Sequence, residues 1–190
     1  MRLLKNRRFK GFYLCFVLLL ILIICGSAIA YADSGTAKTT VKAGSLTESS
    51  ATNQENLQVS KKLRMASYTL PITVIDARGS GKGWKLTITS TRFKMTSSKG
   101  ELPTNASSIT GVSLSCNAHS TCTNPTNSIS YPLIVPAGNP LPRPVKFFNA
   151  SVKSGLGKFL LSMMVNVTIP HGTNPGTYSS TVILAIANGP

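Results

Sequence analysis

The residues of this chain with the widest range of possible chemistry lie in the segment CNAHSTC, from Cys116 to Cys122. Two thiols this close form a disulfide by default outside the cell, and a ring this small constrains the unfolded chain only modestly. A zinc site with His119 as a further ligand is the alternative. It lacks the paired ligand spacing of structural zinc sites, and His171 is distant in sequence. We therefore predict a Cys116 to Cys122 disulfide and no metal site.

Acid and base catalysis has few candidate residues in this chain. Its five carboxylates are Asp33, Glu48, Glu55, Asp76 and Glu101, so a paired acid and base is hard to assemble. The chain has neither a Gly-x-Ser-x-Gly nor a His-Glu-x-x-His segment. The glycines at 79, 81 and 83 fit no phosphate-binding pattern, since a strand is expected after them instead of a helix. We expect a protein that is not an enzyme and needs no cofactor.

The only tryptophan, Trp84, lies in a strand-like run in which Leu86 and Ile88 share its face. Such an alternation usually packs into a core. The functional alternative is direct contact of Trp84 and Leu86 with a ligand, and Arg78, Lys82 and Lys85 lie near them in the sequence. Those three cations could equally face only water, and Asp76 could pair with Arg78 or cap the turn.

The stretch from Thr73 to Thr89, TVIDARGSGKGWKLTIT, resembles the proximal signature of the WxL domain, a module of Gram-positive cell-surface proteins. A second resemblance lies at the C-terminus, where the family has a second Trp-x-Leu; here Leu184 replaces that tryptophan and Ile186 the following leucine. The positions that carry the two resemblances are Val74, Asp76, Arg78, Gly79, Gly81, Gly83, Trp84 and Leu86, and then Pro175, Gly176, Thr177, Tyr178, Leu184, Ile186 and Pro190.

The resemblance implies a β-sandwich that attaches non-covalently to peptidoglycan and is accompanied by other surface proteins. Because the distal tryptophan is absent, any role of that indole is in doubt. Export is indicated by the chain itself: five basic residues precede an uncharged apolar run from Gly11 to Ala32, which ends in an Ala-x-Ala signal. We predict a cleaved signal peptide over residues 1–32, with an uncleaved membrane anchor as the alternative.

Charge narrows the choice of partner. The formal net charge of the chain is +15, and removal of residues 1–32 takes away five basic and no acidic residues, which leaves 15 − 5, or +10. For an exported chain this balance points to anionic wall polymers, phospholipid headgroups or acidic glycans rather than to nucleic acid, although it could also serve solubility alone.

The periodicity of the chain predicts an all-β fold, a single antiparallel β-sandwich after the signal peptide. We predict that residues 33–62 form a polar segment or a first strand, and that residues 63–190 form the β-sandwich domain. We expect the glycine-rich turn after Asp76 and the loop 170–176 each to join two paired strands. A proline-rich stretch, 136–144, predicts an exposed loop, and Pro132 predicts an edge position. Further strands are expected at 63–75, 83–93, 109–114, 129–135, 146–152, 159–169 and 178–187.

These observations lead to a first hypothesis and an alternative. The first is a secreted, non-catalytic protein of the cell surface that attaches non-covalently to peptidoglycan. The alternative is a structural surface subunit or adhesin that assembles with other surface proteins through exposed strand edges.

Overall fold

The computed structural model describes residues 45–48 and 52–190, which belong to one compact unit, Lys42–Pro190. The predicted signal peptide lies outside these residues. All regular structure in the described part is β-strand, so no helix there is long or apolar enough to cross a membrane. The strands are β1 (Leu46–Glu48), β2 (Thr52–Val59), β3 (Met65–Asp76), β4 (Trp84–Ser90), β5 (Lys94–Met95), β6 (Ser107–Cys116), β7 (Leu133–Ile134), β8 (Val145–Ala150), β9 (Gly157–Thr168) and β10 (Gly176–Asn188).

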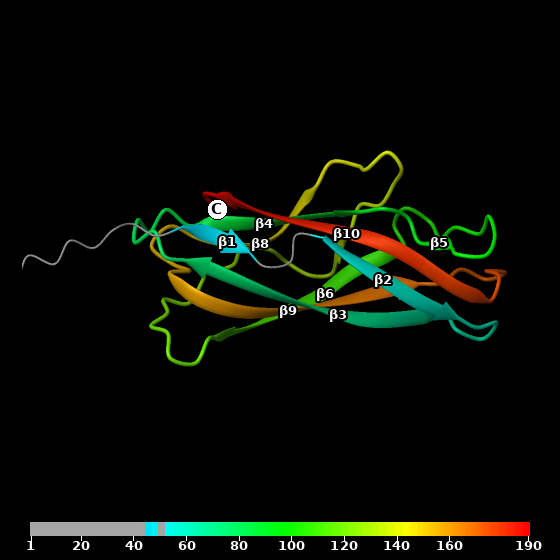
Figure 1. The fold of residues 1–190 in the computed structure, drawn as a ribbon, viewed down its shortest axis with the longest axis horizontal. Coiled ribbons are helices and arrows are strands. Elements are labelled where there is room, and N and C mark those ends of the chain that lie inside the picture. Colours follow the sequence, from blue (N-terminus) through cyan, green and yellow to red (C-terminus); the bar gives the residue numbers. More distant parts are fainter. Residues whose placement is uncertain (1–44, 49–51) are drawn as a thin grey trace, which may run out of the picture. The chain divides into compact units, whose positions relative to one another are not determined.

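The strands form two antiparallel sheets that pack face to face, as predicted (Figure 1). Sheet A has the order β1-β3-β9-β6-β7, and sheet B has the order β2-β10-β4-β8, with β5 beside β10. The period-two alternation of each long strand sends one row of side chains into the space between the sheets. In β9 the inward row is fully apolar and buried, with Phe159, Leu161, Met163, Val165 and Val167 each at most 2% exposed.

Two predicted strand pairings are wrong. The loop 170–176 connects β9 in sheet A to β10 in sheet B, and the glycine-rich turn connects β3 in sheet A to β4 in sheet B. Alternation identifies an inward face but not the strand that lies beside it, because an apolar face packs equally well against the opposite sheet. Ile169 and Tyr178, at the two ends of the first loop, both join one buried cluster between the sheets.

Most strand positions agree with the sequence, and the largest difference lies around Pro132. A strand was expected over 129–135, but only β7 has strand geometry, at the edge of sheet A. The residues before it are held differently, since the Tyr131 hydroxyl donates to the Phe147 carbonyl at 2.7 Å. Prolines at 132 and 136 lack the N–H that a ladder needs, which limits the strand to two residues. The polar segment at the start of the domain contains β1 and β2.

Two strand edges that could recruit another strand are obstructed. β3 pairs with β1 only at Val74–Asp76, and Pro71, which has no N–H, lies in the middle of its remaining edge. The outer edge of β8 is covered by the segment before β7: the Asn149 N–H donates to Asn127 Oδ1 at 3.0 Å, and the Ser128 N–H donates to Asn149 Oδ1 at 3.0 Å.

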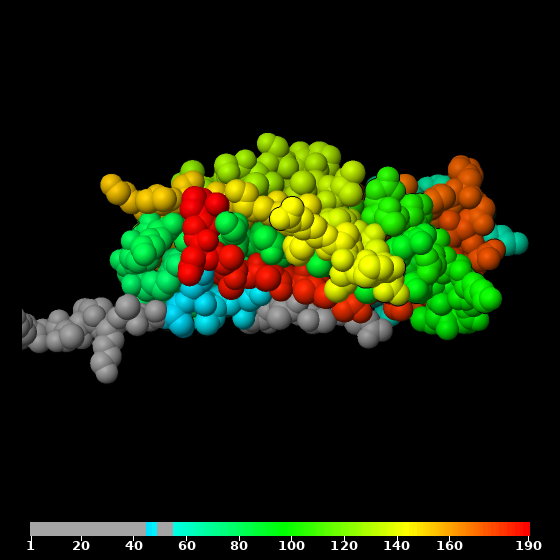
Figure 2. Space-filling view, turned by 90° about the horizontal axis from the view of Figure 1, so that it is seen from above, coloured from blue at the N-terminus to red at the C-terminus, as the bar shows by residue number. Residues whose placement is uncertain are grey.

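The proline-rich loop 136–144 has no regular structure, as predicted, and it lies against the outer face of sheet B. Figure 2 shows this yellow segment beside the red strand β10. It is attached by the Thr89 hydroxyl, which donates to the Pro142 carbonyl at 3.0 Å, and by the Ser90 N–H, which donates to the Pro136 carbonyl at 3.0 Å. The loop therefore hides part of the outer face of sheet B.

Cys116 and Cys122 form a disulfide in the structure, with a sulfur–sulfur distance of 1.99 Å. The bond closes a short loop after β6, at the end of sheet A where β9 begins. Because Cys116 pairs with Phe159, the loop is also held by the β6–β9 ladder.

We predict that the double variant Cys116→Ser/Cys122→Ser folds but loses about 2 kcal/mol in the free energy of unfolding, the value expected for so small a ring. Guanidinium unfolding of the wild type and the variant would measure the difference. Failure of the variant to fold at all would show that the disulfide has a larger role than closure of a loop.

Candidate functional site

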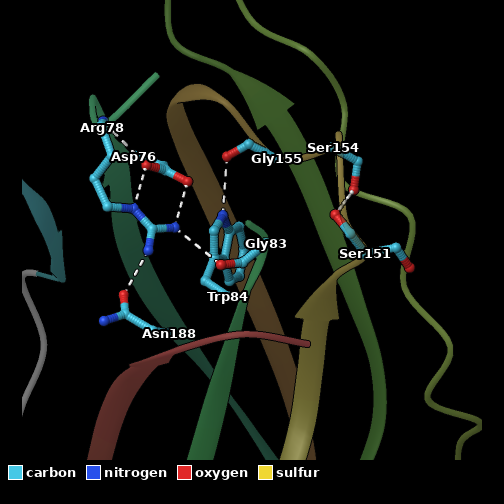
Figure 3. A network of polar contacts seen from close by, with 8 residues as sticks. All are labelled: Asp76, Arg78, Gly83, Trp84, Ser151, Ser154, Gly155 and Asn188. Carbon is cyan, nitrogen blue, oxygen red and sulfur yellow. Dashed lines mark hydrogen bonds and ion pairs between the residues drawn. The ribbon is translucent and has the colours of Figure 1, made fainter. Parts of the chain in front are cut away.

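Asp76 and Arg78 form a two-pronged ion pair at the end of β3 (Figure 3). The Arg78 Nε donates to Asp76 Oδ1 at 2.8 Å, and Arg78 Nη2 donates to Asp76 Oδ2 at 2.7 Å. Nη2 also donates to the Gly83 carbonyl at 2.9 Å, and Nη1 donates to Asn188 Oδ1. One guanidinium thus joins the end of β3, the start of β4 and the end of β10. We call this arrangement the Asp76–Arg78 clamp.

The clamp holds a carboxylate inside the protein. The Asp76 side chain is 0% exposed and that of Arg78 is 14% exposed. Burial by itself would raise the pKa of Asp76, but the hydrogen bonds from Arg78 and its positive charge outweigh burial, so the pKa is lowered. The same hydrogen bonds raise the pKa of Arg78. The pair is therefore ionised at neutral pH, and both charges serve structure.

Trp84 lies in a closed pocket beside the clamp. Its side chain is fully buried, its ring stacks on Phe148 with centroids 5.9 Å apart, and its Nε1 donates to the Gly155 carbonyl at 2.9 Å. The turn that carries Gly155 is held by Ser154, whose hydroxyl donates to the Ser151 carbonyl at 2.8 Å (Figure 3). The indole has its one polar group satisfied and its faces covered, as a structural tryptophan requires.

Two glycines make room for this pocket. Gly83 has φ +73°, and a Cβ there would lie 2.3 Å from the Ala150 carbonyl oxygen. Gly155 has φ +74°, and a Cβ there would lie 2.4 Å from the Ala150 Cβ and 2.7 Å from the Trp84 Nε1. Gly79 and Gly81 also have positive φ but meet no contact closer than 3.6 Å. Hence Gly83 is needed because a side chain there would collide with Ala150, whereas Gly79 and Gly81 are needed only for their backbone conformation.

The two resembling segments, about 100 residues apart in sequence, lie side by side in sheet B. β4 pairs with β10, so that Trp84 lies opposite Asn188, Leu86 opposite Ile186 and Ile88 opposite Leu184. Leu184 is 2% exposed, so the position of the missing tryptophan faces the core.

The other residues of the signatures also support the architecture. Val74 is fully buried against the core, and Tyr178 is 1% exposed with its hydroxyl donating to the Asn174 carbonyl at 2.9 Å. Thr177 Oγ1 accepts a hydrogen bond from Gln58 Nε2 at 2.7 Å, which ties β10 to β2. Val74 and Tyr178 are closed to a large ligand, whereas Thr177 is partly exposed.

The proposed ligand-contacting residues divide into two groups. Trp84 and Leu86 are both 0% exposed, so neither offers a face to a sugar in this structure, and the packing alternative describes them. Arg78 is engaged in the clamp. Lys82 lies exposed in the β3–β4 turn, and Lys85 lies partly exposed on the outer face of sheet B.

Two cations that the sequence analysis did not single out belong beside Lys82. The Lys153 N–H donates to the Gly81 carbonyl at 2.7 Å, which fixes the turn after β8 against the turn before β4. Lys158 lies at the start of β9, next to that turn. Since Lys153 and Lys158 are far from the signature in sequence, only the pairing of the strands could reveal them. Lys82, Lys85, Lys153 and Lys158 lie at the same end of the sandwich, with Lys85 on the outer face of sheet B and Lys158 on that of sheet A. We call these four residues the lysine cluster.

The site offers charge and shape but no assembled reaction centre. Within the described ranges, no three His, Cys, Asp or Glu side chains are grouped to hold a metal ion, and the buried carboxylate of Asp76 is already paired. What this end of the sandwich presents to solvent is positive charge on short turns.

We predict that Asp76→Asn lowers the free energy of unfolding at pH 7 by about 3 kcal/mol, because Arg78 would lose the partner of a buried pair. The lowered pKa means that the contribution of Asp76 is present above the pKa of an unfolded aspartate, about 3.9. It is lost as the pH falls below that value through the pKa of the folded state. Urea unfolding at several pH values should show the two proteins converging below about pH 4. A constant difference down to pH 2 would contradict the assignment.

Gly155→Ala should destabilise the domain by about 3 kcal/mol, because the new Cβ would displace both Ala150 and the indole. Gly172→Ala is the matched control: its φ is +78°, but nothing lies within 4 Å of the added Cβ, so it carries only the backbone cost of about 1 kcal/mol. Fluorescence of Trp84, the only tryptophan, should shift in the folded Gly155→Ala protein and not in Gly172→Ala. Equal losses in both variants would contradict the steric account.

Comparison with protein families agrees with this geometry. The family model described as "WxL domain surface cell wall-binding" matches residues 29–189. Neither the comparison with curated proteins nor that with solved structures found a match. The match covers both signatures except Pro190, and every described strand, including those that form the clamp and the Trp84 pocket. The chain therefore belongs to the WxL domain family of secreted, cell-wall-binding surface proteins.

Proposed function

We propose that this protein attaches non-covalently to peptidoglycan or to an anionic polymer associated with it, and that it does so without catalysing a reaction. The family is one of cell-wall-binding surface domains, which supports the wall as the general partner. The proposal that peptidoglycan or an anionic polymer is the ligand rests on the positions of the charged residues in this chain.

The observation that carries the proposal is the lysine cluster around the Trp84 pocket. None of its four lysines forms an ion pair with a described residue, whereas Arg92 and Lys94, at the other end of β10, are paired with Glu101. Two of the described acidic residues lie at this end: Asp76, whose fully buried side chain is neutralised by Arg78, and Glu48 of β1, which lies opposite Val74 and is partly buried. Positive charge on short turns, in excess of nearby acidic groups, attracts polyanions, and this attraction weakens with salt.

The rigid pocket below supports this role. Lys82 and Lys153 lie on turns joined by the 2.7 Å hydrogen bond from the Lys153 N–H to Gly81. Gly83 of the first turn packs against Ala150 and Ser151, and Gly155 of the second packs on Trp84. The indole thus contributes by holding the two turns in place, instead of by touching a sugar. Lys153 itself has φ +65°, a conformation that non-glycine residues adopt only when the surroundings hold them there.

The alternative function, assembly through exposed strand edges, receives less support. Pro71 interrupts the free edge of β3, and the Asn127 and Asn149 side chains cover the edge of β8. Both are devices that discourage the addition of a strand.

The test is retention of the secreted protein on insoluble peptidoglycan, with and without its teichoic acids, across a salt series. Lys82→Glu/Lys153→Glu should weaken retention about tenfold at low salt, equivalent to about 1.4 kcal/mol, because the variant repels an anionic polymer. The matched control is Lys61→Glu/Lys62→Glu, which makes the same charge change in the exposed β2–β3 turn at the other end of the sandwich.

The proposal is supported if Lys82→Glu/Lys153→Glu reduces retention on the wall more than the control does, and if high salt reduces retention of the wild type. Equal loss in both variants would mean that total charge matters and that the lysine cluster is no specific site. Absence of retention on either wall preparation would refute wall attachment by this chain alone. A Trp84→Ala variant would not distinguish these outcomes, because truncation of a fully buried side chain perturbs the fold.

A further inference from the structure

The outer face of sheet A carries a single charged side chain, Lys158, across its three long strands. Residues 65–73 of β3, 107–116 of β6 and 159–168 of β9 include no Asp, Glu, Lys or Arg. The outward row of these strands consists of Ser, Thr, Asn and apolar side chains, with one lysine, Lys158, at the end near the lysine cluster. In a chain with a net charge of about +10 after loss of the leader, an uncharged face of this size requires an explanation.

Exposed apolar side chains gather on the same face. Six large apolar residues are exposed in the described part of the chain, and four of them point outward from sheet A: Met65 (56%), Ile134 (56%), Leu160 (43%) and Met164 (49%). The four share this face but are not cross-strand neighbours, since Met164 lies opposite Thr69, Leu160 opposite Thr73 and Met65 opposite Thr168. The other two, Leu141 and Val152, lie in loops.

A shallow hollow divides the apolar side chains. It has a volume of about 500 Å³ and lies over the row Pro71, Ser162 and Ser113, with Leu160 also lining it. Because Ser162 is small, the hollow separates Leu160 on one side from Met164 two residues further along β9 on the other. An uncharged centre with exposed Met and Leu around it has the composition of the core of a protein interface.

From these observations we infer that the outer face of sheet A is a docking surface for a second copy of this chain, packed sheet against sheet. A two-fold axis through Ser162, in the plane of the face and perpendicular to β9, would place Leu160 of each copy over Met164 of the other. The arrangement is self-complementary, as a two-fold interface requires, and brings no like charges into contact.

Charge and area favour a second copy as the occupant. Two copies of a strongly basic protein repel each other, and this face brings few charges to the contact, since Lys158 at one end is the only charged side chain in the outward row of its long strands. β3, β6 and β9 have 12, 10 and 12 residues, so the face is about 40 Å long and, over these three strands, about 15 Å wide. The resulting area, about 600 Å² on each copy, is at the lower limit for one side of a specific interface. Sheet B offers no equivalent face, since the loop 136–144 is attached to it.

Sedimentation equilibrium of the secreted protein over a concentration series tests this inference. We expect a monomer–dimer equilibrium that tightens with added salt, because screening reduces the repulsion between copies. This salt dependence is opposite to that expected for wall attachment, so the two proposals can fail separately. Leu160→Lys/Met164→Lys should weaken the dimer by at least about 100-fold.

The matched control is Val152→Lys/Ala185→Lys, which adds the same charge at two exposed positions outside the face, and thermal unfolding verifies that both variants are folded. Dimers that persist in the control and are lost in the face variant support the inference. A protein that stays monomeric at all concentrations and salt conditions would overturn it, as would equal dimerisation in the two variants. Wall retention measured below the dimerisation range should not be reduced by the face variant, because its added lysines do not repel an anionic polymer.

Discussion

The arrangement of this domain depends on a single buried charge pair. Asp76 and Arg78 are two residues apart, yet the guanidinium also reaches the carbonyl of Gly83 and the side chain of Asn188. A buried carboxylate has to be paired, because an unpaired one would cost several kcal/mol. The geometry that satisfies Asp76 therefore fixes the crossing from sheet A to sheet B and the position of the last strand. The Trp84 pocket and the turns that carry the lysines are built against this clamp.

The signature of the family accordingly describes a way of building one end of a sandwich. Gly83 and Gly155 admit close contacts that a Cβ would block, and the indole fills the space they leave. Leu184, where a second tryptophan was expected, faces the core beside Ile88. The loss of the distal indole is thus absorbed by the packing of apolar residues, and the closed pocket at Trp84 remains intact.

Charge is distributed unevenly over the sandwich, and the uneven distribution separates two kinds of contact. Lysines on short turns surround the Trp84 pocket, while the outer face of sheet A has none until Lys158 at its end. The first surface suits a polyanion and the second an uncharged partner. The two surfaces share Lys158 at the end of β9, and contacts on them should respond to salt in opposite directions. A secreted protein held by weak single contacts would gain in attachment from two linked copies.

Local patterns in the chain were sufficient for the all-β class, the positions of most long strands, the exposed proline-rich loop and the resemblance to the WxL family. Each depends on the period of alternation or on short-range chemistry, which the sequence displays directly. The sequence does not predict which strands pair with each other. The turn after Asp76 and the loop 170–176 therefore each connect strands of different sheets, where the sequence pattern indicates paired strands. For the same reason, the sequence is compatible with a Trp84 side chain that is buried and with one that is exposed. Pairing between distant segments buried the indole, brought Lys153 beside Lys82 and gathered Leu160 and Met164 on a neutral face, because only the packed sheets decide which residues share a surface.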